Sequence, residues 1–93
     1  MTVRFWIPSP LRSMTGGRSS VDIETSGCTL RDALHALFAV HPGIRDRILT
    51  EQGEVREHVN LFIGQALARR SGGLATPLAD GVEISIIPAI SGG

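Results

Sequence analysis

Apolar and polar side chains alternate along several short stretches of the chain, and this two-residue period predicts β-strands. In the first stretch, from Thr2 to Pro8, the apolar residues Val3, Phe5 and Ile7 alternate with Arg4 and Trp6. The pattern recurs around Val21 and Ile23, at Val59, Leu61 and Ile63, in a short segment from Ala66 to Ala68, and at Val82, Ile84 and Ile86. The alternation therefore predicts five strands.

A single main helix is predicted between the second and third strands. Five apolar residues recur there with helical spacing: Leu30, Ala33, Leu34, Leu37 and Phe38. Thr29, followed three residues later by Asp32, has the spacing of a capping box, which starts a helix. Because Pro42 disfavours helical backbone at the residue before it, we expect the helix to end near His41.

Two segments show neither period. Pro8, Pro10, Gly16 and Gly17 indicate a loop after the first strand. Residues 44–57 are charged and carry few apolar anchors, so we expect a short helical turn and a surface loop there. The pattern assigns no function to this second segment.

The resulting order of elements is β-β-α-β-β-β. It predicts an α+β fold in which one main helix covers one face of a mixed sheet. We expect residues 1–88 to form this domain. Residues 89–93 contain nothing to hold them against it, so we expect a flexible C-terminal tail.

Composition excludes several classes of function. Nine Arg balance nine Asp and Glu, so no net field draws the chain to nucleic acid or to a membrane. The one cysteine, Cys28, cannot form an internal disulfide, a zinc site or an iron–sulfur cluster, and we expect it to be a buried or half-buried filler. No metal site is expected. Since residues 1–10 lack the pattern of a signal peptide, we expect a cytoplasmic protein.

Several short motifs resemble a known family. The Asp80-Gly81 turn, the last strand running into Ile87-Pro88-Ala89 and the terminal Gly92-Gly93 resemble the end of MoaD/ThiS-type sulfur carriers. Upstream, Ile7-Pro8, Leu11-Arg12, Thr15-Gly16-Gly17 and Val59-Asn60 resemble the cysteine-biosynthetic branch of that family. The resemblance implies the ubiquitin-like β-grasp fold.

The chemistry that this resemblance implies takes place on the carboxylate of Gly93. A ubiquitin-activating-type enzyme, acting as adenylyltransferase and sulfurtransferase, would use ATP to join the carboxylate to AMP and then convert it to a thiocarboxylate. Adenylation makes a poor electrophile reactive, so the carrier needs no catalytic side chain. Ile90, Ser91 and Gly92 would carry Gly93 into the partner's active site. We therefore expect a protein co-substrate, not an enzyme, with no cofactor of its own.

The final acceptor of the sulfur stays open. In the cysteine-biosynthetic branch it is a cysteine synthase that uses pyridoxal phosphate, and a zinc-dependent protease later removes the new cysteine from the carrier. One alternative is the small subunit of molybdopterin synthase, whose tail would enter the large subunit. Another is a ubiquitin-like protein modifier. An electron-transfer β-grasp domain is excluded because one cysteine cannot ligate its cluster.

The alternation also predicts a partner surface. If the helix covers Val3 and Phe5, then Trp6, Phe62 and Ile87 lie on the opposite, solvent-facing side of the sheet. Large apolar side chains on such a face mark an interaction site. We expect this patch, with Arg4 at its edge, to dock the carrier onto a larger enzyme. Loops that fold over the patch are the alternative.

Overall fold

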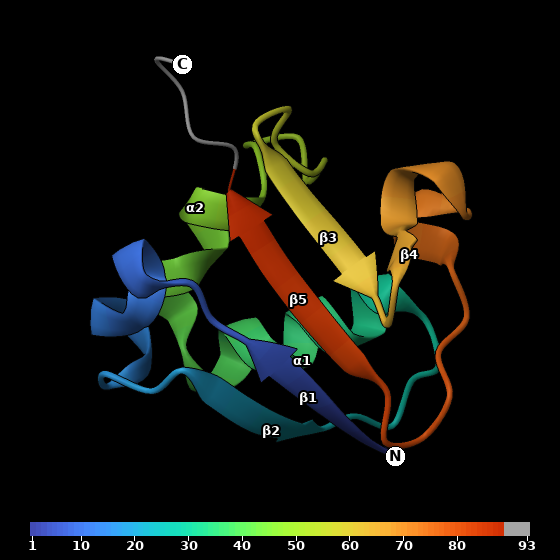
Figure 1. Cartoon of the computed structure of the whole chain (residues 1–93), viewed down its shortest axis with the longest axis horizontal. Coiled ribbons are helices and arrows are strands. Elements are labelled where there is room, and N and C mark those ends of the chain that lie inside the picture. Colours follow the sequence, from blue (N-terminus) through green and yellow to red (C-terminus); the bar gives the residue numbers. More distant parts are fainter. Residues whose placement is uncertain (89–93) are drawn as a thin grey trace.

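A computed structural model describes residues 1–88, which contain a five-stranded mixed sheet with helix α1 across one face (Figure 1). The elements are β1 (Thr2–Trp6), β2 (Ser20–Glu24), α1 (Leu30–Val40), β3 (Val59–Ile63), β4 (Ala66–Leu67) and β5 (Glu83–Pro88). Their order along the chain is the predicted one. The first strand ends two residues earlier than expected, at Trp6, and the fourth ends at Leu67.

The last strand of the chain lies in the middle of the sheet. The strand order is β2-β1-β5-β3-β4, so β5 joins the two halves. It pairs in parallel with β1 and antiparallel with β3, which makes the sheet mixed. This arrangement, with one helix on one face, is the predicted ubiquitin-like β-grasp fold.

Helix α1 begins and ends where the sequence predicts. The main-chain N–H of Asp32 donates to the Thr29 hydroxyl at 3.3 Å, and the Asp32 carboxylate accepts from the Thr29 main chain at 3.2 Å. This reciprocal pair is a capping box. At the other end, His41 N–H donates to the Leu37 carbonyl at 2.8 Å, and Pro42 follows. All five residues predicted for the apolar face are buried.

The core lies between α1 and the inner face of the sheet. The predicted inner residues of the neighbouring strands β1 and β5 are fully buried: Val3, Phe5, Ile84 and Ile86. Ile7 is also fully buried, and Val59 and Leu61 on β3 are almost completely buried. Ile63 and Val82 are only half-buried. Ile63 precedes the turn to β4 and Val82 precedes β5, so both lie at ends of the sheet, where fewer elements cover them.

The prediction of a loop after β1 is wrong, because Ser9–Thr15 form a 3-10 helix, η1. Pro10 lies in its first turn, where a fixed φ favours helical backbone and the missing N–H costs nothing. Leu11 and Thr15 are buried, and Gly16 closes the helix with a φ of 67°. The prolines that suggested a loop thus start a short helix.

The segment after α1 is more closely packed than predicted. It contains the 3-10 helix η2 (Pro42–Ile44) and a four-residue helix, α2 (Arg45–Ile48), which is the expected helical turn. Ile44 and Ile48 are fully buried, and Leu49 forms an isolated β-bridge with Val55. Residues 45–55 are therefore anchored in the core and are not a simple surface loop.

Two short 3-10 helices, η3 (Ala68–Arg70) and η4 (Gly73–Ala75), follow β4. Cys28 is exposed, not a buried filler, because the capping turn that starts α1 directs it outward. Among residues 1–88, no helix has the length and apolar content needed to cross a bilayer.

Candidate docking face and chain end

The sheet holds the end of β5 in a fixed place. Glu83, Ile84 and Ser85 pair with β1 on one side, and residues 84–88 pair with β3 on the other. Pro88, the last described residue, lies opposite Val59 at the start of β3. The predicted tail residues Ile90, Ser91, Gly92 and Gly93 lie outside the described residues. The fold therefore fixes the point and direction from which they leave the domain.

An apolar patch lies on the outer face of the sheet, beside this strand. Trp6 pairs with Ser85, and Ser85 pairs with Phe62, so the two aromatic side chains flank a small residue on β5. Trp6 and Ile87 are each 36% exposed, and Phe62 is half-buried. The strand register is thus the one predicted. We call Trp6, Phe62 and Ile87 the outer patch.

Arg12, which the sequence analysis did not assign to a site, lies against the outer patch. Its guanidinium carbon is 5.7 Å from the centre of the Trp6 ring, within range of a cation–π contact. Its Nε donates to the Ile7 carbonyl at 3.0 Å, which fixes the guanidinium in place. Arg12 therefore holds the Trp6 ring in one orientation. No pattern in the sequence indicates this contact, because it depends on η1 folding back toward β1.

Arg4 lies on the outer face, two residues before Trp6. It donates to Asp22 through Nε at 2.8 Å and through a terminal nitrogen at 3.3 Å, and it lies opposite Glu83 on β5. The hydrogen bond from Arg4 lowers the pKa of Asp22. Both side chains are more than half exposed, so solvent weakens the pair. Arg4 thus lies at the edge of the outer patch with its charge largely balanced by Asp22.

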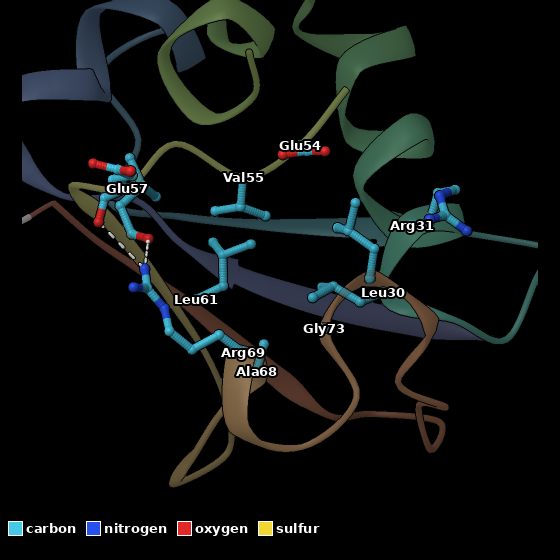
Figure 2. A pocket seen from close by; sticks show the side chains of 11 residues that line it. Leu30, Arg31, Glu54, Val55, Glu57, Leu61, Ala68, Arg69 and Gly73 are labelled. Carbon is cyan, nitrogen blue, oxygen red and sulfur yellow. Dashed lines mark hydrogen bonds between the residues drawn. The ribbon is translucent and has the colours of Figure 1, made fainter. Parts of the chain in front are cut away.

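A groove of about 420 Å³ lies between β3, the start of α1 and the 3-10 helices η3 and η4 (Figure 2). Its apolar lining includes Leu30, Val55, Leu61, Ala68 and Leu74. Arg69 crosses one end of it and donates to the main-chain carbonyls of Glu57 at 3.4 Å and Val59 at 2.9 Å. Since β4 pairs only with residues 62 and 63, Arg69 satisfies a carbonyl of β3 that β4 does not reach. Its role in the fold is to tie η3 to the start of β3.

The described part of the chain has no cluster of metal-ligating side chains. No group of three or more His, Cys, Asp or Glu side chains within residues 1–88 is arranged to hold a metal ion. Cys28 is separate from the outer patch, at the start of α1.

Comparison with known proteins gives a consistent result. Residues 6–93 match the ThiS family. The chain is 40% identical to the sulfur carrier protein CysO of Mycobacterium tuberculosis over the full length of both, and the crystal structure of that protein superposes with a TM-score of 0.85. CysO in the crystal structure of the BexX/CysO complex of Amycolatopsis orientalis is 34% identical, covers 98% of this chain and 99% of that one, and gives a TM-score of 0.87.

A third relative is a modifier. Small archaeal modifier protein 1 of Haloferax volcanii is 34% identical over 83% of this chain and 85% of its own length. These relatives are named as sulfur carriers and as a modifier, and one structure is a complex of CysO with BexX, which agrees with the predicted role of a protein co-substrate. The chain therefore belongs to the ThiS family of ubiquitin-like, MoaD/ThiS-type sulfur carriers.

Proposed function

We propose that this carrier receives sulfur on the carboxylate of Gly93 and donates it to the synthesis of cysteine. The carboxylate attacks the α-phosphate of ATP in a ubiquitin-activating-type enzyme, which forms an acyl adenylate and releases pyrophosphate. A sulfur nucleophile then displaces AMP and leaves a thiocarboxylate. The observation that supports this best is the 40% identity, over the full length of both chains, to a protein named as the sulfur carrier CysO.

The fold supports such a reaction without contributing a catalytic group. Because β5 is held between β1 and β3, the residues after Pro88 start from a rigid base. Glycines have no Cβ, so Gly92 and Gly93 suit a narrow channel in a partner enzyme. The cofactors of the pathway, ATP, pyridoxal phosphate and zinc, would belong to the activating enzyme, the cysteine synthase and a protease.

The outer patch supplies the docking surface in this proposal. It lies across β1, β5 and β3, and the end of the central strand β5 leads to the tail, so a partner seated on the patch is well placed to receive Gly93. Aromatic side chains are the residues that most often dominate such interfaces. The ordered Trp6 ring, held by Arg12, reduces the entropy lost on binding.

The direct test uses the purified carrier, its activating enzyme, ATP and a sulfide donor. Intact mass spectrometry should show replacement of one oxygen by sulfur, located on Gly93 by fragmentation and reversed by hydrolysis. Deletion of Gly93 should abolish both adenylation and the mass change. The melting temperature of the truncated protein should stay that of the wild type, because the buried core described above lies within residues 1–88. Adenylation of the truncated protein would contradict the proposal.

A second candidate is a ubiquitin-like modifier, which is favoured by the similarity to small archaeal modifier proteins. The same adenylate would then acylate lysine side chains on other proteins. The two functions differ in their products. Incubation of the thiocarboxylated carrier with a cysteine synthase and an activated serine should release the activating group of the serine and extend the carrier by one cysteine, whereas a modifier would appear in isopeptide-linked conjugates.

A further inference from the structure

A basic cluster lies around a hollow on the surface of residues 46–58. Arg47, Arg56 and His58 line this hollow of about 380 Å³ together with Asp46. Arg47 and Arg56 belong to residues 44–57, to which the sequence pattern assigned no function, and His58 follows this segment directly. We call Arg47, Arg56 and His58 the basic cluster.

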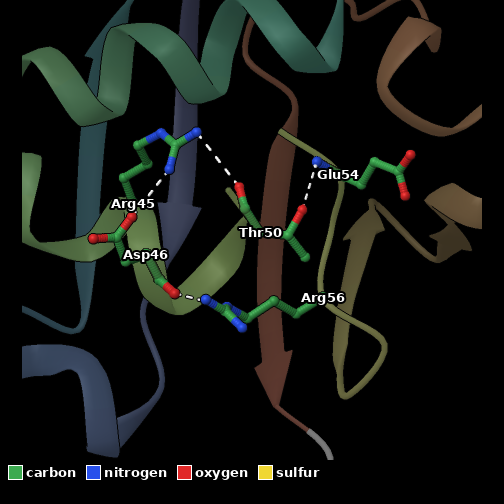
Figure 3. Close-up of polar contacts among 5 residues, drawn as sticks. All are labelled: Arg45, Asp46, Thr50, Glu54 and Arg56. Atoms are coloured by element: carbon green, nitrogen blue, oxygen red, sulfur yellow. Dashed lines mark hydrogen bonds and ion pairs between the residues drawn. The ribbon is translucent and has the colours of Figure 1, made fainter. Parts of the chain in front are cut away.

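A network of hydrogen bonds fixes the backbone that carries the cluster (Figure 3). Thr50 N–H donates to the Glu54 carbonyl at 2.7 Å, and Glu54 N–H donates to the Thr50 hydroxyl at 3.3 Å. Arg56 N–H donates to the Ile48 carbonyl at 3.0 Å, which joins the two sides of the segment. With Ile48 fully buried, the cluster stands on a rigid support.

The lining of the hollow carries more positive than negative charge, with two guanidinium groups and one carboxylate, while Glu54 and Glu57 of the same segment line the separate groove next to α1. Arg56 donates through Nε to the main-chain carbonyl of Asp46 at 2.7 Å, which is a neutral acceptor (Figure 3). The Asp46 carboxylate accepts from Arg45 at 3.0 Å and forms an ion pair with it. Within residues 1–88, neither Arg47 nor Arg56 forms an ion pair with a carboxylate. In the described part of the chain, Nε is the one Arg56 side-chain nitrogen that donates a hydrogen bond, so its two terminal nitrogens keep their donors for a partner.

The cluster lies at the same end of the sheet as the end of β5. The main-chain N–H of Val59 donates to the Arg56 carbonyl at 3.0 Å, so Arg56 and His58 form the turn into β3. Val59 in turn pairs with Pro88. The basic cluster therefore borders the place where the chain leaves the sheet.

We propose that the basic cluster docks onto an acidic protein surface that surrounds the entrance to the partner's active site. This inference rests on the proposed function, in which the residues after Pro88 enter that site. Guanidinium groups bind carboxylates with two parallel hydrogen bonds, which gives orientation as well as attraction. Charges at the rim of an interface act mainly on the rate of association. The apolar outer patch holds the partner, and the basic cluster directs the chain end toward the entrance.

The test compares two double variants of equal charge change in binding to the purified activating enzyme. Arg47→Glu with Arg56→Glu alters the cluster, and Arg31→Glu with Arg70→Glu alters exposed arginines elsewhere. Stopped-flow measurement at low salt should show association slowed about tenfold for the cluster variant and about twofold or less for the control. The difference should shrink as salt is raised. Arg47→Glu alone keeps the hydrogen bond of Arg56 and should give part of the effect with wild-type melting temperature.

Each other outcome has a definite meaning. Equal association rates for the two double variants would overturn the inference, since net charge alone would then explain any change. A higher KM for ATP with an unchanged KM for the carrier would also overturn it, because the cluster would then contact phosphate. Adenylation of wild type and cluster variant at equal rates would overturn it and leave the proposed function intact. If the wild type binds the enzyme but is not adenylated, the proposed function is overturned and the inference on the basic cluster stands. If the wild type does not bind, the result counts against both the inference and the proposed function.

Discussion

At the scale of single residues, the outer patch depends on the small side chain of Ser85. Ser85 lies between Trp6 and Phe62 on three adjacent strands, so a small side chain separates the two aromatic rings. An apolar side chain of a partner that lies over Ser85 can contact both rings. Leu61, the neighbour of Phe62, points the other way and is 2% exposed. We therefore expect adjacent residues of β3 to serve binding and stability separately.

This separation gives a test on two neighbouring residues. Phe62→Ala should weaken binding to the activating or the acceptor enzyme by about 1–3 kcal/mol, since aromatic anchors dominate interfaces. Leu61→Ala should instead lower the free energy of unfolding by about 2–5 kcal/mol. Titration calorimetry and denaturant unfolding measure the two effects. Unchanged affinity of folded Phe62→Ala for both enzymes would remove the outer patch from the mechanism.

At the scale of elements, α1 owes its defined start to Asp32. The Asp32 carboxylate accepts hydrogen bonds from the hydroxyl and the main chain of Thr29 and from Cys28 N–H. The Thr29 hydroxyl, followed by its main-chain N–H, lowers the pKa of Asp32. A carboxyl whose pKa is lowered on folding stabilises the fold above its unfolded pKa, and this contribution is lost as the pH falls through the folded value.

The pH dependence of stability follows from that sign. Asp32→Asn should lower the melting temperature at pH 7, because the amide carries no charge to interact with the start of the helix. The gap from wild type should begin to narrow below about pH 4, the unfolded value, and close once the pH falls below the lower folded value, where the wild-type carboxyl also loses its charge. Glu51→Gln, an exposed change in the turn after α2, is the control and should give no gap. A gap that persists at pH 2 would show that charge is not the cause.

The sequence predicts the elements that have a strict period and misses those that do not. The alternation in β1, β3 and β5 and the helical spacing in α1 each bury one face, so pattern and structure agree. A 3-10 helix such as η1 is too short for a period to emerge, and its prolines also suit a loop. The basic cluster likewise depends on the hydrogen bond from the Arg56 side chain to the Asp46 carbonyl, which no spacing reveals.

At the scale of the whole molecule, most elements of the described residues share one core. Residues from β1, β2, α1, η2, α2, β3 and β5 form a single buried cluster. A domain of this size is stabilised by about 5–15 kcal/mol in total, so loss of one buried side chain takes a large share. The domain should therefore unfold as one unit.

Two alanine substitutions on α1, one at a buried and one at an exposed position, test this single core. Leu37 is fully buried, and Leu37→Ala should lower the free energy of unfolding by about 2–5 kcal/mol. Val40 is 61% exposed at the end of the same helix, so Val40→Ala should leave it almost unchanged. Denaturant unfolding followed by circular dichroism and by Trp6 fluorescence should give coincident curves. Similar stability for the two variants would mean that the buried face of α1 is wrongly assigned.

The central position of β5 also determines when the domain can fold during synthesis. The pairs β1–β2 and β3–β4 are made early, but they meet only through β5. Before residues 83–88 leave the ribosome, β1 and β3 each have an unpaired edge, and the core lacks the buried side chains Ile84 and Ile86. Closure of the sheet thus requires contacts between the two ends of the chain, which slows folding. A nascent chain of this carrier stays open, and sensitive to proteases and aggregation, until its last strand has been made.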